Sequence, residues 1–331
     1  MKLSDVVVGL DVHLKNTQVT VMKLNGEIVK KERVATTKAE LRRCLESVPK
    51  GSKVALESVG FCWPWIDFLG RLEFEVLLAN PVKVKYRAED VKTDRVDSKL
   101  LADLTRMNWL PTCYVPPSEL KVLRNLLRHR AFRTKLSTGV KNKTKSEFRK
   151  RDVDLDVNLG TVKGRKAAVE LGVFEVNQNI ELLELMDRQN KEIEALLERK
   201  YGDVKPVLLL MSIPGIGFIS ALTLYAEICD IKRFSNAEKL AHYAGLVPSV
   251  HQSGEHSFSG RETRGDAWLK WILIEVAWCH VRYCPKGHLA EVFKETRKRK
   301  GNSRDAIKVV ARKLVNVVWA VLTYEQEFMV K

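Results

Sequence analysis

Cysteines, long apolar runs and acidic residues are all scarce in this sequence. None of its six cysteines belongs to a Cys-x-x-Cys pair, so we expect reduced thiols in a cytoplasmic protein. No apolar run reaches the length of about eighteen residues that a membrane span needs, and no signal peptide is recognisable. We therefore expect a protein that neither crosses a membrane nor is secreted. The 331 residues, 45% of them hydrophobic, are enough for two or three domains with real cores.

Basic residues outnumber acidic ones, 57 Lys and Arg to 41 Asp and Glu, which gives a net charge of +16. This excess predicts a polyanionic partner, most often nucleic acid. Between Ser118 and Arg151, twelve Lys or Arg stand against two acids, and leucines recur at helical spacing. We predict a basic amphipathic helix that contacts a phosphate backbone, with a solvated helix face as the alternative. The predicted contacts are Arg124, Arg128, Arg130, Arg133, Lys141, Lys143, Lys145 and Arg149.

A run of valines from Val6 to Val12 predicts a strand that is buried on both faces. Two strands joined by an Asn-Gly turn follow, and then a helix, a strand, a helix and a strand. This order predicts an α/β domain with a mixed sheet over residues 1–110. The expected elements are strands Thr17–Lys23, Ile28–Val34, Lys53–Glu57 and Phe74–Leu78, a helix opened by Thr37, and a helix Trp63–Leu69.

Two acids end predicted strands of this domain, Asp11 after the valine run and Glu57 after the next buried strand. Open α/β sheets place their sites at the carboxyl ends of strands, so we expect the two to lie together. Asp94 and Asp97 are three residues apart and share one face at the start of a predicted helix. Capping of that helix explains one aspartate well and two less well. Four such carboxylates suit two Mg²⁺ (or Mn²⁺) ions that activate a nucleophile at a phosphodiester.

Residues 111–205 are predicted to form a basic helical and coiled-coil connection. Leu182, Met186, Gln189, Ile193 and Leu196 alternate spacings of four and three, which predicts a seam that either joins protomers or packs within the chain; we favour dimerisation. Residues 206–331 read as a mainly α-helical domain, with a helix at Phe218–Ile228 and a closing helix at Val309–Leu322. Its serines Ser249, Ser253, Ser257 and Ser259 are equal candidates from their residue type alone, and a serine before glycine is often a turn residue.

The four acids resemble the Asp-Glu-Asp-Asp tetrad of a RuvC-like, ribonuclease-H-fold nuclease domain. The phrase Lys-Thr-Asp-Arg-Val-Asp-Ser-Lys-Leu-Leu-Ala (residues 92–102) is similar to the signature of the insertion-sequence "one-ten" family of transposases. The stretch from Gly245 to Gly254 resembles the second signature of that family, Gly-Leu-x-Pro, four residues, Ser-Gly. The resemblance covers nearly the whole chain. It implies a RuvC-like α/β domain, a helical connection and a helical transposase domain.

The family resemblance also implies a function. A protein of this kind is a DNA recombinase that moves its own insertion sequence, guided by a structured noncoding RNA, the bridge RNA, that pairs with donor and target DNA. Ser253 matches the family's nucleophile, and Asp11, Glu57, Asp94 and Asp97 match its Mg²⁺ ligands. A homo-oligomer, a dimer or a dimer of dimers, is expected in the cytoplasm at the nucleoid. Because the serine and the tetrad lie in different domains, we expect a site assembled between protomers to be possible.

The sequence departs from the family in one place. A lysine usually stands two residues before the glycine that corresponds to Gly265, and here that residue is Thr263. Arg261 and Arg264 are the nearby candidates for holding the scissile phosphate.

Three other functions stay open at this point. A RuvC-like nuclease of the junction-resolvase type would use water and leave Ser253 structural. A non-catalytic nucleic-acid-binding protein would need only the basic stretches. An actin-like sugar kinase can also open with Gly9-Leu10-Asp11, but its glycine-rich phosphate loops are missing.

Overall fold

The chain divides into two compact units, residues 1–115 and residues 116–331, which are described separately. This computed structural model describes residues 5–85, 94–153, 157–253, 256–262 and 265–329. For residues 94–97, 249–253 and 256–262 it describes the backbone and not the side chains. Most of the predicted connection, residues 116–205, clusters with the C-terminal helices in the second unit.

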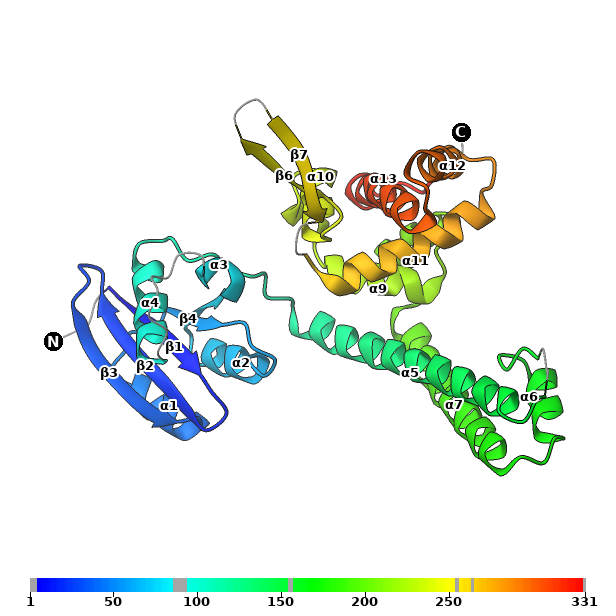
Figure 1. Cartoon of the computed structure of the whole chain (residues 1–331). Helices are drawn as coiled ribbons and strands as arrows, with labels where there is room; N and C mark the ends of the chain where they lie inside the picture. Colours follow the sequence, from blue (N-terminus) through cyan, green and yellow to red (C-terminus); the bar gives the residue numbers. More distant parts are fainter. Residues whose placement is uncertain (1–4, 86–93, 154–156, 254–255, 263–264, 330–331) are drawn as a thin grey trace. The chain divides into compact units, whose positions relative to one another are not determined.

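The first unit is built on a mixed sheet of five strands in the order β3-β2-β1-β4-β5 (Figure 1). Strands β1, β2 and β3 are antiparallel, whereas β4 and β5 run parallel to β1. The mixed sheet and the alternation of strands with helices confirm the predicted ribonuclease-H-like fold class. The strands are β1 Val6–Val12, β2 Asn16–Lys23, β3 Ile28–Ala35, β4 Lys53–Glu57 and β5 Glu75–Ala79.

Helices cover both faces of this sheet. On one face the even-numbered residues of β1 pack with α1 (Lys38–Leu45) and α2 (Trp63–Arg71) in one buried cluster. Helix α1 begins after Thr37, whose side chain accepts a hydrogen bond from the Glu40 amide, as an N-cap does. The other face is covered by α4 (Asp94–Arg106), and a short helix α3 (Pro81–Lys85) follows β5.

Gly9 permits an unusually close contact between β1 and α4. A Cβ at this position would lie 2.0 Å from the Ser98 carbonyl oxygen and 2.7 Å from the Ala102 nitrogen, both backbone atoms of α4. No side chain fits at such distances, so the helix lies directly on the strand only because residue 9 is glycine. The Thr20 and Ser98 hydroxyl oxygens lie 3.0 Å apart in the same buried contact.

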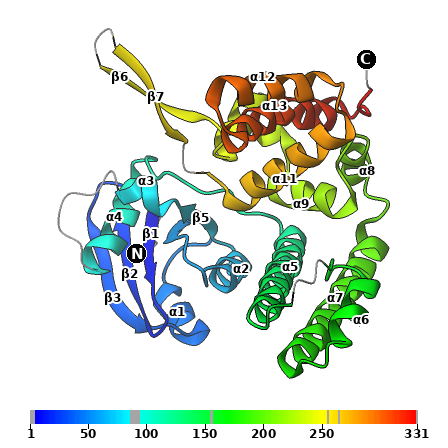
Figure 2. The same ribbon diagram turned by 45° about the vertical axis from the view of Figure 1, so that its right-hand side comes forward.

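The second unit is mainly helical, as predicted (Figure 2). Its long helices α5 (Ser118–Arg149) and α7 (Phe174–Tyr201) pack against each other, and the C-terminal helices bury a large apolar core. A two-stranded hairpin, β6 (Pro248–Ser253) and β7 (His256–Glu262), extends from the helices. The other helices are α6 Val162–Val169, α8 Lys205–Met211, α9 Phe218–Ile228, α10 Ala237–Tyr243, α11 Ala267–Tyr283, α12 His288–Lys300 and α13 Ser303–Tyr324, with a 3₁₀ turn at Ile231–Arg233.

The predicted seam on α7 is buried in part within this chain, because Met186 is buried and Ile193 packs against the core. Leu182 and Leu196 are exposed, whereas Val176, Ile180 and Leu183 are buried with the far end of α5 and with α6. The face of α7 that packs within this chain therefore contains only some of the predicted seam residues, and the dimer that the seam was expected to join stays a prediction. Helix α6 itself lies in a stretch that the sequence pattern left unassigned. No helix in the described parts of the chain is both long and apolar enough to cross a membrane.

Candidate active site and nucleic-acid interface

Asp11 and Glu57 lie at the carboxyl ends of adjacent parallel strands. Leu10 of β1 pairs with Leu56 of β4, so the two acids are the next residues of their strands. Asp11 follows Gly9 by two residues and therefore lies on the face that α4 covers. Glu57 follows Ala55 by two residues, and Ala55 packs with leucines of α4. Both carboxylates therefore share one face, with backbones about 5 Å apart across the strand pair.

The first turn of α4 lies toward the same end of the sheet. Ala102 packs with Val7, and one turn earlier Ser98 contacts Gly9, so the helix approaches Asp11 in the direction of its own N-terminus. Asp94 and Asp97 belong to the turn before Ser98. Their backbone therefore lies one helical turn beyond Ser98, in the direction in which β1 runs from Gly9 to Asp11. The side chains of Asp94 and Asp97 are outside the described part of the structure.

His13 is a neighbour of this site that the sequence analysis did not select. Its Nε2 lies 3.0 Å from Oδ2 of Asp11, which is 7% exposed. The sequence did contain a signal for this contact, because side chains at positions i and i+2 of a strand point to the same side, as Asp11 and His13 do. Carboxylate oxygens are the ligands that Mg²⁺ prefers, so Asp11 and Glu57 fit a magnesium site. Among the described residues no cluster of three potential metal ligands occurs, and two members of the tetrad are outside that set.

Ser253 is the last residue of β6 and pairs with His256 of β7. This is the last pair of the hairpin, at the end opposite the pair of Pro248 and Glu262. At the other end of the hairpin, the Asp266 amide donates to the Tyr243 carbonyl at 2.8 Å. Gly245 and Gly265 meet there, because a Cβ on Gly265 would lie 2.3 Å from the Gly245 nitrogen. Ser249, Ser257 and Ser259 belong to the same two strands. Arg261 lies in β7, while Thr263 and Arg264 are outside the described residues.

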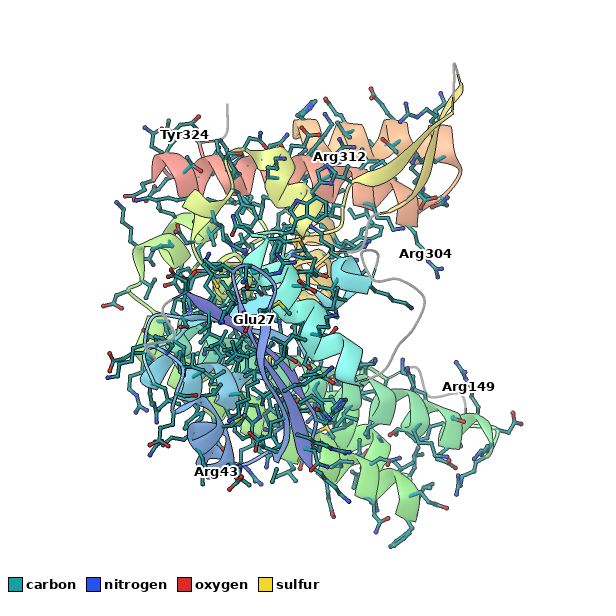
Figure 3. The ribbon with its side chains drawn as sticks, turned by 90° about the vertical axis from the view of Figure 1, so that its left-hand side faces the viewer. Glu27, Arg43, Arg149, Arg304, Arg312 and Tyr324 are labelled. Carbon is teal, nitrogen blue, oxygen red and sulfur yellow. The ribbon has the colours of Figure 1, made fainter. Side chains whose placement is uncertain are left out.

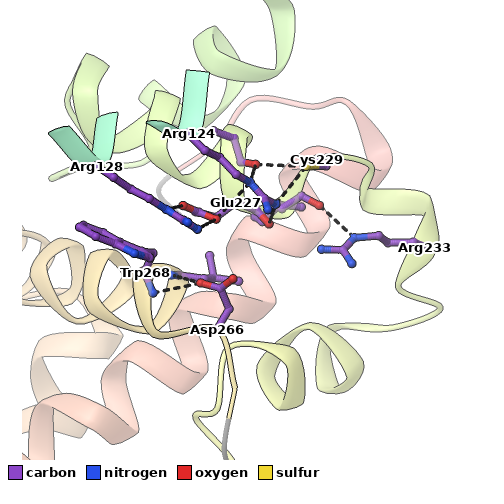
Figure 4. Close-up of polar contacts among 10 residues, drawn as sticks. Arg124, Arg128, Glu227, Cys229, Arg233, Asp266 and Trp268 are labelled. Atoms are coloured by element: carbon purple, nitrogen blue, oxygen red, sulfur yellow. Dashed lines mark hydrogen bonds and ion pairs between the residues drawn. The ribbon is translucent and has the colours of Figure 1, made fainter. Parts of the chain in front are cut away.

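The basic helix α5 forms as predicted, but the prediction that Arg124 contacts phosphate needs correction (Figure 4). Arg124 is 9% exposed and donates to the Ala226 and Glu227 carbonyls at 2.7 and 2.9 Å. The Glu227 carboxylate, 1% exposed, accepts two hydrogen bonds from Arg128 at 3.0 and 2.9 Å. Arg128 also lies over the Trp268 ring. These donors are used inside the protein, joining α5 to α9 and α11.

Glu227 is the residue that sequence reasoning missed in this network. Burial raises the pKa of the Glu227 carboxyl group. The positive charges of Arg124 and Arg128 act in the opposite direction and favour the ionised carboxylate. The sequence offered one signal, an acid inside the apolar helix Phe218–Ile228. A buried acid of this kind needs basic partners.

The cations beyond Arg128 divide into paired and exposed groups. Arg130 donates to Glu194 of α7 at 2.7 Å. Lys143, Lys150 and Arg151 surround Glu147 and lower the pKa of its carboxyl group to about 2 through hydrogen bonds. Lys145 and Arg149 are exposed, and Arg133 and Lys141 are partly exposed. Figure 3 shows Arg149 extending from the ribbon. These four keep their cationic ends available for a phosphate backbone.

The first unit carries strand-end carboxylates on a ribonuclease-H-like sheet, and the second carries exposed cations on a long helix. This combination is typical of proteins that bind and process nucleic acid. Two family models match the chain. The model DEDD_Tnp_IS110, described as "Transposase", matches residues 8–149, and the model described as "Transposase IS116/IS110/IS902 family" matches residues 207–291.

Two curated relatives match nearly the whole chain, and a third matches about a third of it. The transposase for insertion sequence element IS1111A of Coxiella burnetii is 24% identical over 97% of this chain and 91% of its own length. A probable family 20 transposase of Pseudomonas aeruginosa is 24% identical over 96% and 97%. The pilin gene-inverting protein of Moraxella bovis is 31% identical over 36% and 38%. The chain belongs to the IS116/IS110/IS902 family of insertion-sequence transposases, enzymes that cut and rejoin DNA.

Proposed function

We propose that this transposase cuts and rejoins DNA strands through a covalent intermediate on Ser253, with Mg²⁺ (or Mn²⁺) held by Asp11, Glu57, Asp94 and Asp97. The observation that carries the metal site is the position of Asp11 and Glu57 on one face at adjacent strand ends, with the first turn of α4 directed to the same end. Bound there, the ions would lower the pKa of a hydroxyl group and neutralise charge on the scissile phosphate.

The serine reaction conserves the energy of the phosphodiester. The Ser253 oxygen forms a bond to phosphorus while one ester bond from phosphorus to oxygen breaks. The serine loses its proton, and the departing oxygen gains one and becomes a hydroxyl group on the cut strand. Reversal of these steps by another strand end rejoins the DNA. A hydrolase that uses water cannot rejoin strands in this way, because its product is a free phosphate end.

The proposal extends to partners that the family resemblance implies. Donor and target DNA would be selected by a structured guide RNA, and a homo-oligomer would hold two DNA partners at once. Exposed cations on α5, among them Lys145 and Arg149, would contact a phosphate backbone. Arg261 and Arg264, close in sequence to Thr263 at the place of the family lysine, would hold the scissile phosphate in its stead. Nucleic-acid partners would place the protein at the nucleoid in the cytoplasm.

A denaturing gel tests the nucleophile. Labelled DNA carrying the element's ends is incubated with guide RNA, Mg²⁺ and the protein, and a covalent adduct runs as a shifted band. Ser253→Ala should lose the adduct and all rejoining, while Ser249→Ala, Ser257→Ala and Ser259→Ala serve as matched controls from the same hairpin. An adduct that persists in Ser253→Ala would reassign the nucleophile. Cutting by the wild type without any adduct would favour the hydrolytic nuclease.

A further inference from the structure

A cavity of about 490 Å³ opens at the turn between β1 and β2, and its lining includes His13, the residue that contacts Asp11. We call it the β1–β2 cavity. Its size lies within the range of about 300–1,000 Å³ that is typical of small-molecule sites. The residues of its lining that matter here are His13, Leu14, Lys15, Gln18, Arg33 and Phe61. The cavity is not used in the cutting chemistry described above.

The sheet register places this cavity at a defined distance from the carboxylates. Asp11 is the direct partner of Gln18 on β2, and Gln18 is the direct partner of Arg33 on β3. Direct partners share a face, so acid, amide and cation form one row across three strands. Neighbouring strands are about 4.8 Å apart, which puts the Arg33 backbone roughly 10 Å from that of Asp11. At this distance Arg33 is placed to bind a ligand group next to the one at Asp11, and not the ions that Asp11 would hold.

The charge of the lining points to an anionic ligand. No carboxylate is among the lining residues, whereas Lys15 and Arg33 are both exposed there. Neither cation forms an ion pair with any residue that the structure describes. Several other cations of this unit do form pairs, such as Lys23 with Glu27 and Arg43 with Glu32. The two cavity cations keep their charge available for a phosphate group.

The rest of the lining suits a base. Phe61 is partly buried and packs on the core beneath it, so its ring is held in place. Leu14 is 78% exposed, a high value for a large apolar side chain. An aromatic ring and an adjacent apolar side chain form a surface on which a base can stack. Gln18, 7% exposed, offers amide groups that can bond to the edge of a base.

We propose that the β1–β2 cavity binds one nucleotide of the DNA strand next to the phosphodiester that is cut. Its base stacks on Phe61 and Leu14, and its phosphate lies between Lys15 and Arg33. This inference rests on the proposed metal site at Asp11 for the position of the cut. The cavity is a binding site, and none of its residues takes part in a bond change.

Photocrosslinking of the full-length protein tests the inference. A benzophenone amino acid replaces Leu14, and the probe is labelled oligothymidylate, with oligouridylate as the RNA arm. The control places the same group at Leu24, which is 52% exposed in the same unit. Leu14 should crosslink to oligothymidylate and Leu24 should not. Phe61→Leu, which keeps the apolar packing, should reduce the crosslink by about tenfold or more because stacking is lost.

A second experiment removes the two cations of the cavity. Lys15→Gln combined with Arg33→Gln should weaken the Leu14 crosslink, and Lys31→Gln with Lys38→Gln, an equal loss of exposed charge in the same unit, should not. Crosslinking to oligouridylate alone, equal crosslinking from Leu14 and Leu24, or no crosslink would each overturn the proposal. DNA cutting is assayed in parallel. If the protein without these further substitutions cuts DNA but gives no crosslink from position 14, this inference alone is defeated. If it gives the crosslink but no Mg²⁺-dependent cutting, the proposed function alone is defeated.

Discussion

Replacing Arg124 by methionine separates a structural role of this residue from a role in phosphate binding. Two carbonyl acceptors at the end of α9, those of Ala226 and Glu227, would lose a charged donor. Hydrogen bonds to charged groups contribute about 1.5–3 kcal/mol each, so two of them amount to about 3–6 kcal/mol. The Glu227 carboxylate would keep Arg128 as a partner. We therefore expect Arg124→Met to lower the free energy of unfolding of the second unit by about 3–6 kcal/mol.

Urea denaturation and the salt dependence of DNA binding together measure this effect. Arg124→Met should lower the unfolding midpoint and leave the slope of log affinity against log salt unchanged. Arg149→Met, at an exposed position of the same helix, should behave in the opposite way and reduce the slope by about one. A triple replacement of Arg124, Arg128 and Glu227 by apolar residues of similar size should recover much of the lost stability. Unchanged stability with a reduced slope in Arg124→Met would refute this reasoning.

Three further predictions follow from the described geometry. Asp11→Asn should abolish DNA cutting and leave DNA binding intact, and full cutting by this variant, or by the wild type in EDTA, would contradict the metal site. Gly9→Ala should destabilise the first unit by about 3 kcal/mol or more, because its Cβ would meet the α4 backbone; an unchanged melting temperature would show that the helix yields freely. The lowered pKa of Glu147, about 2, stabilises the fold above the unfolded value near 4.5, and this contribution is lost as pH falls from there toward 2. The stability gap between wild type and Glu147→Gln should therefore close in acid, and a gap that does not change with pH would contradict the ion cluster.

Local pattern was sufficient to predict most of the first unit. The valine run, the Asn-Gly turn and the Thr37 cap correspond to β1, the β2–β3 turn and the start of α1. Each of these signals acts over a few residues, so no knowledge of distant contacts was required. The position of Asp11 and Glu57 at neighbouring strand ends also followed from the order of the strands.

Long-range contacts account for what the sequence did not predict. Arg124 stands among basic residues and reads as a phosphate ligand, but its partners lie about a hundred residues later in α9. Which apolar residues of α7 are buried within the chain also depends on long-range packing, since Leu183 is buried with the end of α5 whereas Leu182 is exposed. The β1–β2 cavity needs Arg33 and Phe61 beside the β1–β2 turn, and that neighbourhood comes from strand pairing rather than from any motif.

The hairpin that carries Ser253, the proposed nucleophile, has the geometry of a lever. Six residues of β6 span about 20 Å, and the hairpin's base is fixed where Gly245 meets Gly265 and where Asp266 bonds to Tyr243. A rotation of about 10° at that base would displace the far end by roughly 3.5 Å, about the full separation of reacting atoms before attack. If Ser253 is the nucleophile, as proposed, a methyl group added at Gly265 should change the reaction rate by shifting the base of the hairpin, although residue 265 lies at the end remote from the serine.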